Sequence, residues 1–202
     1  MVIAITGGIG SGKSYVCSLL EQRGISVYDC DFAAKRLMRE SKSLQRRLTE
    51  TVGEEVFPNG KLDKALLSRF IVTSDANAQK VNAVVHPAVA DDFMASGMEW
   101  FESAILFESG FVSRVHIDYI VCVVAPLEER VSRIMRRDSI SREKALEWIN
   151  RQMSQEEKAV KADFCIINDR ENDLDAQIDR LLEEINNKRK NNNNGNNSCY
   201  FR

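Results

Sequence analysis

The fold is decided by the stretch VIAITGGIGSGKS at residues 2–14. Four apolar residues suited to a buried strand lead into a glycine-rich turn that matches the pattern G-x-x-x-x-G-K-[ST] at every position. Glycines let such a turn adopt positive φ angles and let several N–H groups converge on one anion. The stretch therefore predicts a strand, a loop that binds nucleotide phosphates, and a helix that begins beside the anion.

The same motif predicts which groups contact the nucleotide. Lys13 is expected to reach the β- and γ-phosphates, and the Ser14 hydroxyl is expected to bind Mg²⁺. The other nucleotide contacts are expected from Gly8, Gly10, Ser11, Gly12 and Tyr15. The alternative is a glycine-rich turn without a ligand, but the position of the motif between a strand and an amphipathic segment favours the phosphate loop.

Composition sets the class of protein. The chain has 202 residues, 44% hydrophobic and 29% charged, which is typical of one soluble globular domain with insertions. Its net charge of −2 gives no sign of a nucleic-acid or membrane partner. The sequence lacks a secretory signal and a membrane-spanning run, and its cysteines show no C-x-x-C spacing. We expect a cytoplasmic protein, and the sequence leaves open a monomer or a weak oligomer.

Polar residues follow several strand candidates. After a helix over residues 13–23, a second strand over 25–28 runs into Asp29 and Asp31. Ligands of open α/β sheets bind at the carboxyl ends of strands, so Asp31 is expected near the transferred phosphate. Asp31 could instead cap the following helix, over residues 32–40, and one carboxylate can do both.

Two later strand ends also carry candidate site residues. A third strand over 100–107 ends in Glu108, which is expected to hold a water on Mg²⁺ or to orient a substrate; the alternative is a solvated strand-end charge. A fourth strand is expected over 117–124. A fifth, over 163–167, ends in Asn168, which is expected to read the edge of the nucleotide base.

The segment 32–97 is longer than a crossover between two strands requires. Its helical pattern predicts an insertion that binds the second substrate, with segments at 43–52, 62–72, 75–85 and 88–96. Pro87 suits the first turn of a helix, which would leave His86 near that helix N-terminus as a substrate contact. A histidine that only packs or caps is the alternative.

Arginines gather on two expected helices, over residues 127–137 and 142–153. Arg133 and Arg137 share a helix face at i, i+4 spacing. Such runs are commonly solvated faces paired with acids. Beside a phosphate loop they favour a lid over 127–161 that closes on a triphosphate and stabilises developing charge.

These segments predict an α/β fold of P-loop NTPase type. Residues 1–31, 98–126 and 162–190 are expected to form a doubly wound, five-stranded parallel sheet, completed by the helical insertion, the helical lid and a last helix over 173–188. The asparagine-rich stretch 191–202 lacks apolar residues to pack, so the sequence predicts a disordered tail.

The ordered set of motifs resembles the dephospho-coenzyme A kinase family from Val2 to about Leu182. The matching pieces are T-G-G-I-G-S-G-K-S at 6–14, D-x-D at 29–31, H-P at 86–87, L-x-E at 106–108, R-x-x-x-R-D at 133–138, R-Q at 151–152 and A-D-x-x-I-x-N at 162–168. The chain departs from the family pattern at Tyr15, where Thr is usual.

The resemblance implies transfer of the γ-phosphoryl group of Mg·ATP to the ribose 3′-hydroxyl of dephospho-CoA. It implies that Asp31 is the general base or positions the hydroxyl, and that His86 lies near the pantetheine arm. Lys13, Arg133 and Arg137 would stabilise the transferred charge. Another small-metabolite or nucleoside-monophosphate kinase, or a nucleotide-dependent switch, are the alternatives; the insertion and the lid arginines favour a kinase with two substrates.

Overall fold

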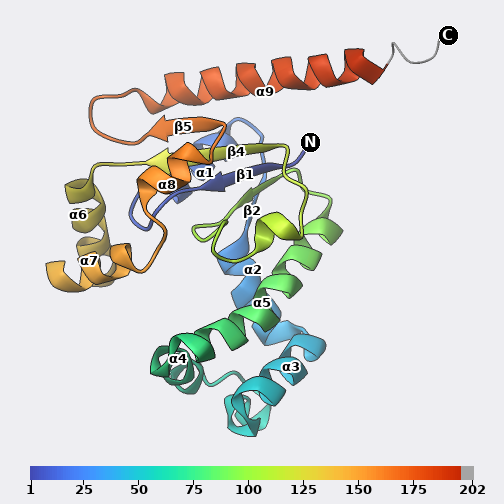
Figure 1. The fold of residues 1–202 in the computed structure, drawn as a ribbon, viewed down its shortest axis with the longest axis vertical. Helices are drawn as coiled ribbons and strands as arrows, with labels where there is room; N and C mark the ends of the chain where they lie inside the picture. Colours follow the sequence, from blue (N-terminus) through green and yellow to red (C-terminus); the bar gives the residue numbers. More distant parts are fainter. Residues whose placement is uncertain (197–202) are drawn as a thin grey trace.

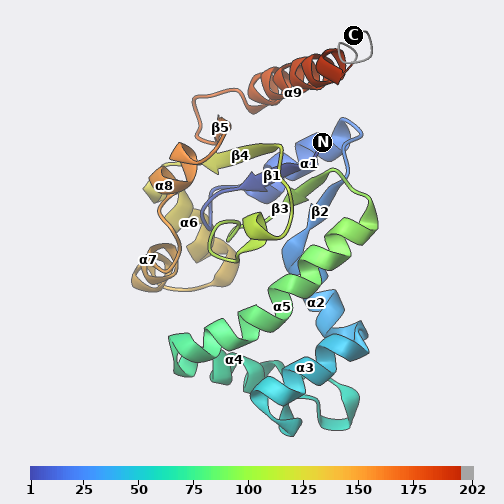
Figure 2. The same ribbon diagram turned by 45° about the vertical axis from the view of Figure 1, so that its right-hand side comes forward.

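The computed structural model describes residues 1–196 and contains a parallel sheet between two layers of helices (Figure 1). The strands are β1 (Ile3–Thr6), β2 (Val27–Asp29), β3 (Trp100–Glu102), β4 (Tyr119–Val124) and β5 (Phe164–Ile167). Their order is β2-β3-β1-β4-β5, and all neighbouring pairs are parallel (Figure 2). The predicted five-stranded parallel α/β sheet is confirmed, with β1 and its loop at the centre of the carboxyl edge.

Side chains of β1 alternate between the two faces of the sheet. Ile3 and Ile5 pack into a core shared with helices α1 and α9, whereas Ala4 packs into a core shared with α2 and α5. Both faces are therefore covered, as a parallel sheet requires. The α-helices are α1 (Lys13–Gln22), α2 (Cys30–Glu40), α3 (Lys42–Val52), α4 (Lys64–Thr73), α5 (Asp75–Ser96), α6 (Leu127–Asp138), α7 (Arg142–Asn150), α8 (Gln155–Val160) and α9 (Leu174–Asn196).

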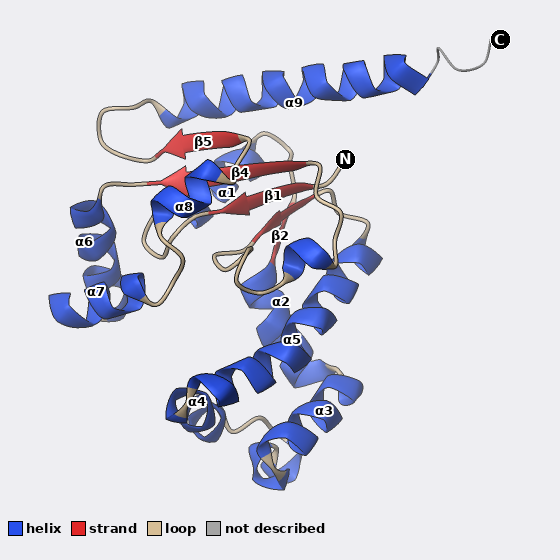
Figure 3. Cartoon of the chain, viewed as in Figure 1, coloured by secondary structure: helices blue, strands red, loops and turns tan. Residues whose placement is uncertain are grey.

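The chain between β2 and β3 is helical and extends away from the sheet (Figure 3). It contains α2 to α5 and two short 3-10 turns, η1 (Glu54–Val56) and η2 (Pro58–Gly60). The prediction of two helices separated at Pro87 is wrong, because α5 is continuous and Pro87 lies inside it. Val81, Val85 and Val89 are buried at every fourth position on either side of the proline. This packing offsets a helix-interior proline, which costs about 3 kcal/mol.

Strand β3 is shorter than the apolar run predicts. It ends at Glu102, which is opposite Ile5 of β1 and Asp29 of β2. The Ser103 N–H still donates to the Ile5 carbonyl at 2.9 Å, but β1 enters the phosphate loop after Thr6 and β2 has already entered α2, so pairing goes no further. The chain turns away instead and buries Leu106 in the same core cluster as Phe111 of the 3-10 turn η3 (Phe111–Ser113). Glu108 therefore does not lie at a strand end, and Glu102 does.

The C-terminal helix is longer than expected. α9 packs Ile178, Leu181 and Ile185 onto the sheet and continues to Asn196, into the stretch for which the sequence predicts disorder. Extending a helix that packing has already formed is easier than starting one. The rest of that stretch, 197–202, lies outside the described residues. Among residues 1–196, no helix combines the length and the apolar composition needed to cross a bilayer.

Candidate active site

The loop between β1 and α1 presents unused N–H groups. In the described part of the chain, those of Gly10, Gly12, Lys13 and Ser14 donate to no protein acceptor. α1 also begins without a side-chain cap, so its positive end is open to an anion. Gly12 has φ +93°, and a Cβ there would lie 1.9 Å from the Asn168 amide nitrogen. Only glycine fits this position, and the arrangement is that of a phosphate site.

A cavity of about 310 Å³ opens beside this loop and collects most of the predicted site residues. Its walls come from the loop, the start of α2, the end of β3 and helix α6. The lining residues are Ile9, Gly10, Gly12, Lys13, Ser14, Asp31, Glu102, Ala104, Arg133, Ile134, Arg137 and Gln152. The structure therefore brings the loop lysine, two carboxylates and two arginines of α6 to one cavity.

Lys13 and Glu102 form the charged floor of the cavity. The Lys13 Nζ lies 3.7 Å from the Glu102 Oε1, and only 9% and 12% of their side-chain surfaces are exposed. Burial lowers the pKa of Lys13. Burial raises the pKa of Glu102 to about 7, and the negative charges of Asp31 and Asp29 act in the same direction. Sequence reasoning missed Glu102 because it placed this residue inside a longer strand. A carboxylate within an apolar run was the available signal.

Asp29 and Asp31 have different roles. The Asp29 carboxylate caps α2 by accepting the Phe32 N–H at 2.8 Å. Asp31 lies in the first turn of the helix and lines the cavity. The alternative that Asp31 is the cap is therefore wrong, because the helix begins one residue before it. Among residues 1–196 the Asp31 carboxylate has no hydrogen-bond or ion-pair partner and lines the cavity.

The two predicted lid arginines also differ. The Arg133 guanidinium donates to the carbonyl oxygens of Gly10 (3.3 Å), Ser11 (3.1 Å) and Asn168 (3.1 Å), so it is already used in holding the loop. Among residues 1–196, Arg137 pairs only with its neighbour Asp138, and 61% of its side chain is exposed. Arg137 is the arginine of α6 that can turn toward a bound phosphate.

Three predicted contacts have other partners in the structure. Asn168 is buried and donates its amide to the Ser11 carbonyl at 2.8 Å, so it supports the loop, and its base contact stays a prediction. The Tyr15 N–H donates to the Gly12 carbonyl at 3.0 Å. Glu108 accepts the Met153 N–H at 3.0 Å and pairs with Lys158 at 2.9 Å, outside the cavity.

His86 lies within α5 and does not line the cavity. Its Nδ1 is 3.1 Å from the Ser109 carbonyl oxygen, and burial lowers its pKa while Asp31 opposes that shift. Gly8 and Ser11 belong to the loop but also do not line the cavity. For these residues the predicted ligand contacts stay predictions.

The oxygen groups at the cavity fit Mg²⁺. This ion prefers oxygen ligands and usually keeps waters while sharing one or two carboxylates with substrate phosphates. Ser14, Asp31 and Glu102 supply a hydroxyl and two carboxylates to the lining of the cavity. Within residues 1–196 no cluster of three or more His, Cys, Asp or Glu side chains could hold a metal ion by itself.

Known proteins of similar sequence and structure belong to a kinase family, which agrees with the geometry of the cavity. A family model described as dephospho-CoA kinase matches residues 1–184. A dephospho-CoA kinase from Bacteroides fragilis is 46% identical, covering 89% of this chain and 90% of that protein, and one from Fusobacterium nucleatum is 35% identical over 92% and 98%. A crystal structure from Thermus thermophilus shares 34% identity with a TM-score of 0.75, covering 93% and 97% of the two chains. The chain belongs to the dephospho-CoA kinase family, whose members are ATP-dependent transferases with a hydroxyl acceptor.

Proposed function

We propose that the chain transfers the γ-phosphoryl group of ATP to the ribose 3′-hydroxyl of dephospho-CoA, giving coenzyme A and ADP. The observation that carries the proposal is the cavity in which the free loop N–H groups, Lys13, Asp31, Glu102 and Arg137 meet. Phosphoryl transfer requires positioning and charge neutralisation more than covalent chemistry, and this set supplies both.

Each residue of the cavity has a role in the proposed reaction. The loop N–H groups and Lys13 hold the β- and γ-phosphates. The acceptor oxygen attacks the γ-phosphorus while the bond to the β–γ bridging oxygen breaks, and the hydroxyl proton passes to the Asp31 carboxylate. Arg137 turns in to stabilise charge on the transferred group. Bound Mg²⁺, held by Ser14 with Asp31 or Glu102, would neutralise charge on the phosphate oxygens.

The acceptor is proposed to lie along one face of α2. Asp31, Lys35 and Arg39 share this face at i, i+4 and i+8 spacing, so Lys35 lies about 6 Å and Arg39 about 12 Å along the helix from Asp31. At its far end is a groove of about 280 Å³, lined by Lys35, Met38, Arg39, Leu62, Lys64, Leu67, Ser68 and Ile71. Dephospho-CoA carries a diphosphate between its ribose and its pantetheine arm, which matches cations followed by apolar side chains.

An acceptor screen tests the reaction. Purified protein with Mg·ATP should convert dephospho-CoA to coenzyme A, and mass spectrometry should find the new phosphate on the 3′-oxygen. Thymidylate, guanylate and a sugar acid should remain unmodified. Efficient phosphorylation of one of these compounds, with dephospho-CoA unchanged, would show that the acceptor is wrong.

A separate variant tests the acceptor path. Lys35→Met should raise the KM for dephospho-CoA about tenfold through loss of a phosphate contact, with the KM for ATP unchanged. Lys80→Met is the control, because Lys80 is an exposed lysine of α5 that does not line the groove. Equal KM values for the two variants would place the acceptor elsewhere.

A further inference from the structure

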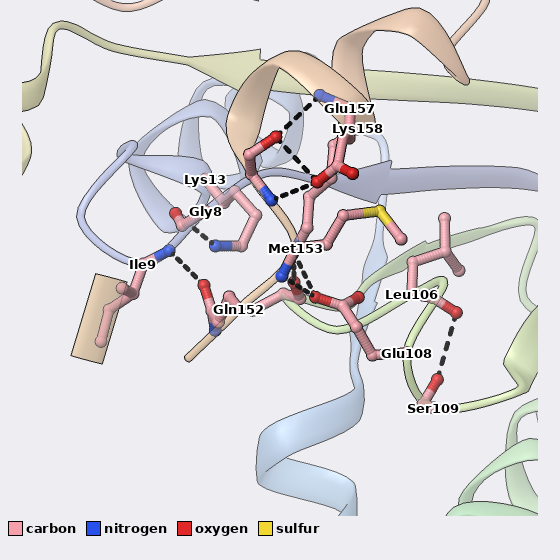
Figure 4. A network of polar contacts seen from close by, with 12 residues as sticks. Gly8, Ile9, Lys13, Leu106, Glu108, Ser109, Gln152, Met153, Glu157 and Lys158 are labelled. Carbon is pink, nitrogen blue, oxygen red and sulfur yellow. Dashed lines mark hydrogen bonds and ion pairs between the residues drawn. The ribbon is translucent and has the colours of Figure 1, made fainter. Parts of the chain in front are cut away.

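Two side chains of the lid segment form hydrogen bonds with the backbone at the tip of the phosphate loop. The Ile9 N–H donates to the Gln152 Oε1 at 2.8 Å, and the Ile9 carbonyl accepts from the Arg130 Nε at 3.0 Å. Gln152 follows α7 and Arg130 belongs to α6, so both partners are more than 120 residues away in sequence. Figure 4 shows the Gln152 side chain reaching the Ile9 N–H beside Gly8 and Lys13.

These contacts fix the orientation of two peptide groups. In a planar trans peptide the N–H and C=O point in opposite directions, and no cis peptide occurs in residues 1–196. With the Ile9 N–H held by Gln152, the Gly8 carbonyl points back into the loop, where it lies 3.4 Å from the Lys13 Nζ. With the Ile9 carbonyl held by Arg130, the Gly10 N–H points away from α6. This is one of the unused donors of the phosphate site.

Arg130 has no other partner that explains its burial. Only 6% of its surface is exposed, and no described carboxylate lies within ion-pair distance of it. Its guanidinium also occupies the space where a Gly8 side chain would lie, because a Cβ there would be 2.4 Å from one terminal nitrogen. Burying the charge of an arginine without a carboxylate partner lowers the stability of the fold. The contact of Arg130 with the loop is therefore explained better by the function of the loop than by stability.

We propose that Arg130 and Gln152 are positioning residues that hold the phosphate loop in its anion-binding shape before the nucleotide arrives. They orient the Gly10 N–H and the Gly8 carbonyl, which in turn places Lys13. The base of the lid is thereby part of the phosphate site. Preorganised donors bind a charged ligand more tightly because they need no rearrangement.

A second set of contacts keeps Gln152 in place. The next residue, Met153, donates its N–H to Glu108, and Glu108 pairs with Lys158 (Figure 4). Lys158 is fully buried and also donates to the Ala104 carbonyl at 2.6 Å. The corner between α7 and α8 is therefore fastened both to the phosphate loop and to the chain that follows β3.

The test compares two glutamines of the same corner. Gln152→Met removes the acceptor of the Ile9 N–H. Gln155→Met is the matched control, since Gln155 accepts the Ala125 N–H at 2.7 Å and does not contact the loop. We expect Gln152→Met to weaken MgADP binding about tenfold in calorimetry, with dephospho-CoA binding unchanged. Gln155→Met should bind MgADP as the wild type does, although its melting temperature should fall by a similar amount.

The proposal is overturned if Gln152→Met binds MgADP within twofold of the wild type, or if both variants weaken it equally. Should Gln152→Met fail to fold, Arg130→Met removes the contact from the other side and is judged by the same tenfold criterion. This proposal rests on the proposed function only in assuming that the loop binds a nucleotide, and it does not depend on which acceptor is used. MgADP titration needs no acceptor, so a wrong acceptor and a wrong positioning role give different results.

Discussion

Replacing Glu102 with Gln should remove a pH dependence from the stability of the empty protein. Burial raises the pKa of Glu102 from its ordinary 4.5 to about 7, although Lys13 lies 3.7 Å away. Between these two values the unfolded chain has lost the proton and the folded chain keeps it. The free energy of unfolding contributed by this group therefore falls as pH rises from about 4.5 to about 7 and is constant above. At about 1.4 kcal/mol per pH unit, the loss is about 3 kcal/mol.

The measurement is urea unfolding of wild type and Glu102→Gln between pH 5 and 7.5, without nucleotide or divalent cation. The amide does not titrate. The free energy of unfolding of the variant should therefore rise relative to that of the wild type with increasing pH, by up to about 3 kcal/mol between pH 5 and pH 7.5. The same variant should lose most of its kcat, because a carboxylate beside the phosphate site is gone. If the free energies of unfolding of the two proteins change with pH in parallel, the pKa of Glu102 is not raised in the folded state.

Three further outcomes follow from the placement of single side chains. Asp31→Asn should lower kcat by about 10²- to 10⁴-fold with unchanged thermal stability. Asp29→Ala should lower the free energy of unfolding by about 1 kcal/mol, because the helix cap is lost. A near-normal kcat for Asp31→Asn would show that Asp31 is not the base for the acceptor hydroxyl. Arg137→Met should lower kcat about 100-fold and leave ATP affinity nearly intact, and the reverse pattern in steady-state kinetics would make it a ground-state contact. Glu108→Gln should lower the free energy of unfolding by about 3 kcal/mol because it strands the buried Lys158, and Lys158→Met should cost less; equal losses in urea unfolding would contradict this reasoning.

Local sequence predicted the elements whose physics is local. The apolar run before Gly7 predicts β1, and Gly12-Lys13-Ser14 predicts both the phosphate loop and the start of α1, because glycine freedom and the lysine charge act within a few residues. The position of Asp31 beyond β2 also follows from chain order, since carboxyl ends of parallel strands share one edge of the sheet.

Other features depended on packing between distant segments. Pro87 reads as a helix start, but buried side chains on both sides of it keep α5 continuous. The apolar run after Trp100 reads as one long strand, but β3 ends at Glu102 because its neighbours leave the sheet there. In each case a local preference was overridden by the pairing or burial available in three dimensions.

The sequence by itself determined that this is an α/β phosphotransferase built on a phosphate loop, and it predicted that Lys13 and Asp31 lie beside the nucleotide. Only the tertiary structure decided that Glu102 is the second carboxylate at the cavity and that Gln152 accepts the Ile9 N–H of the loop. The physical reason is the range of the interactions. A turn or a cap is encoded within four residues, whereas an ion pair or hydrogen bond between residues about 90 or more positions apart exists only after the chain has packed.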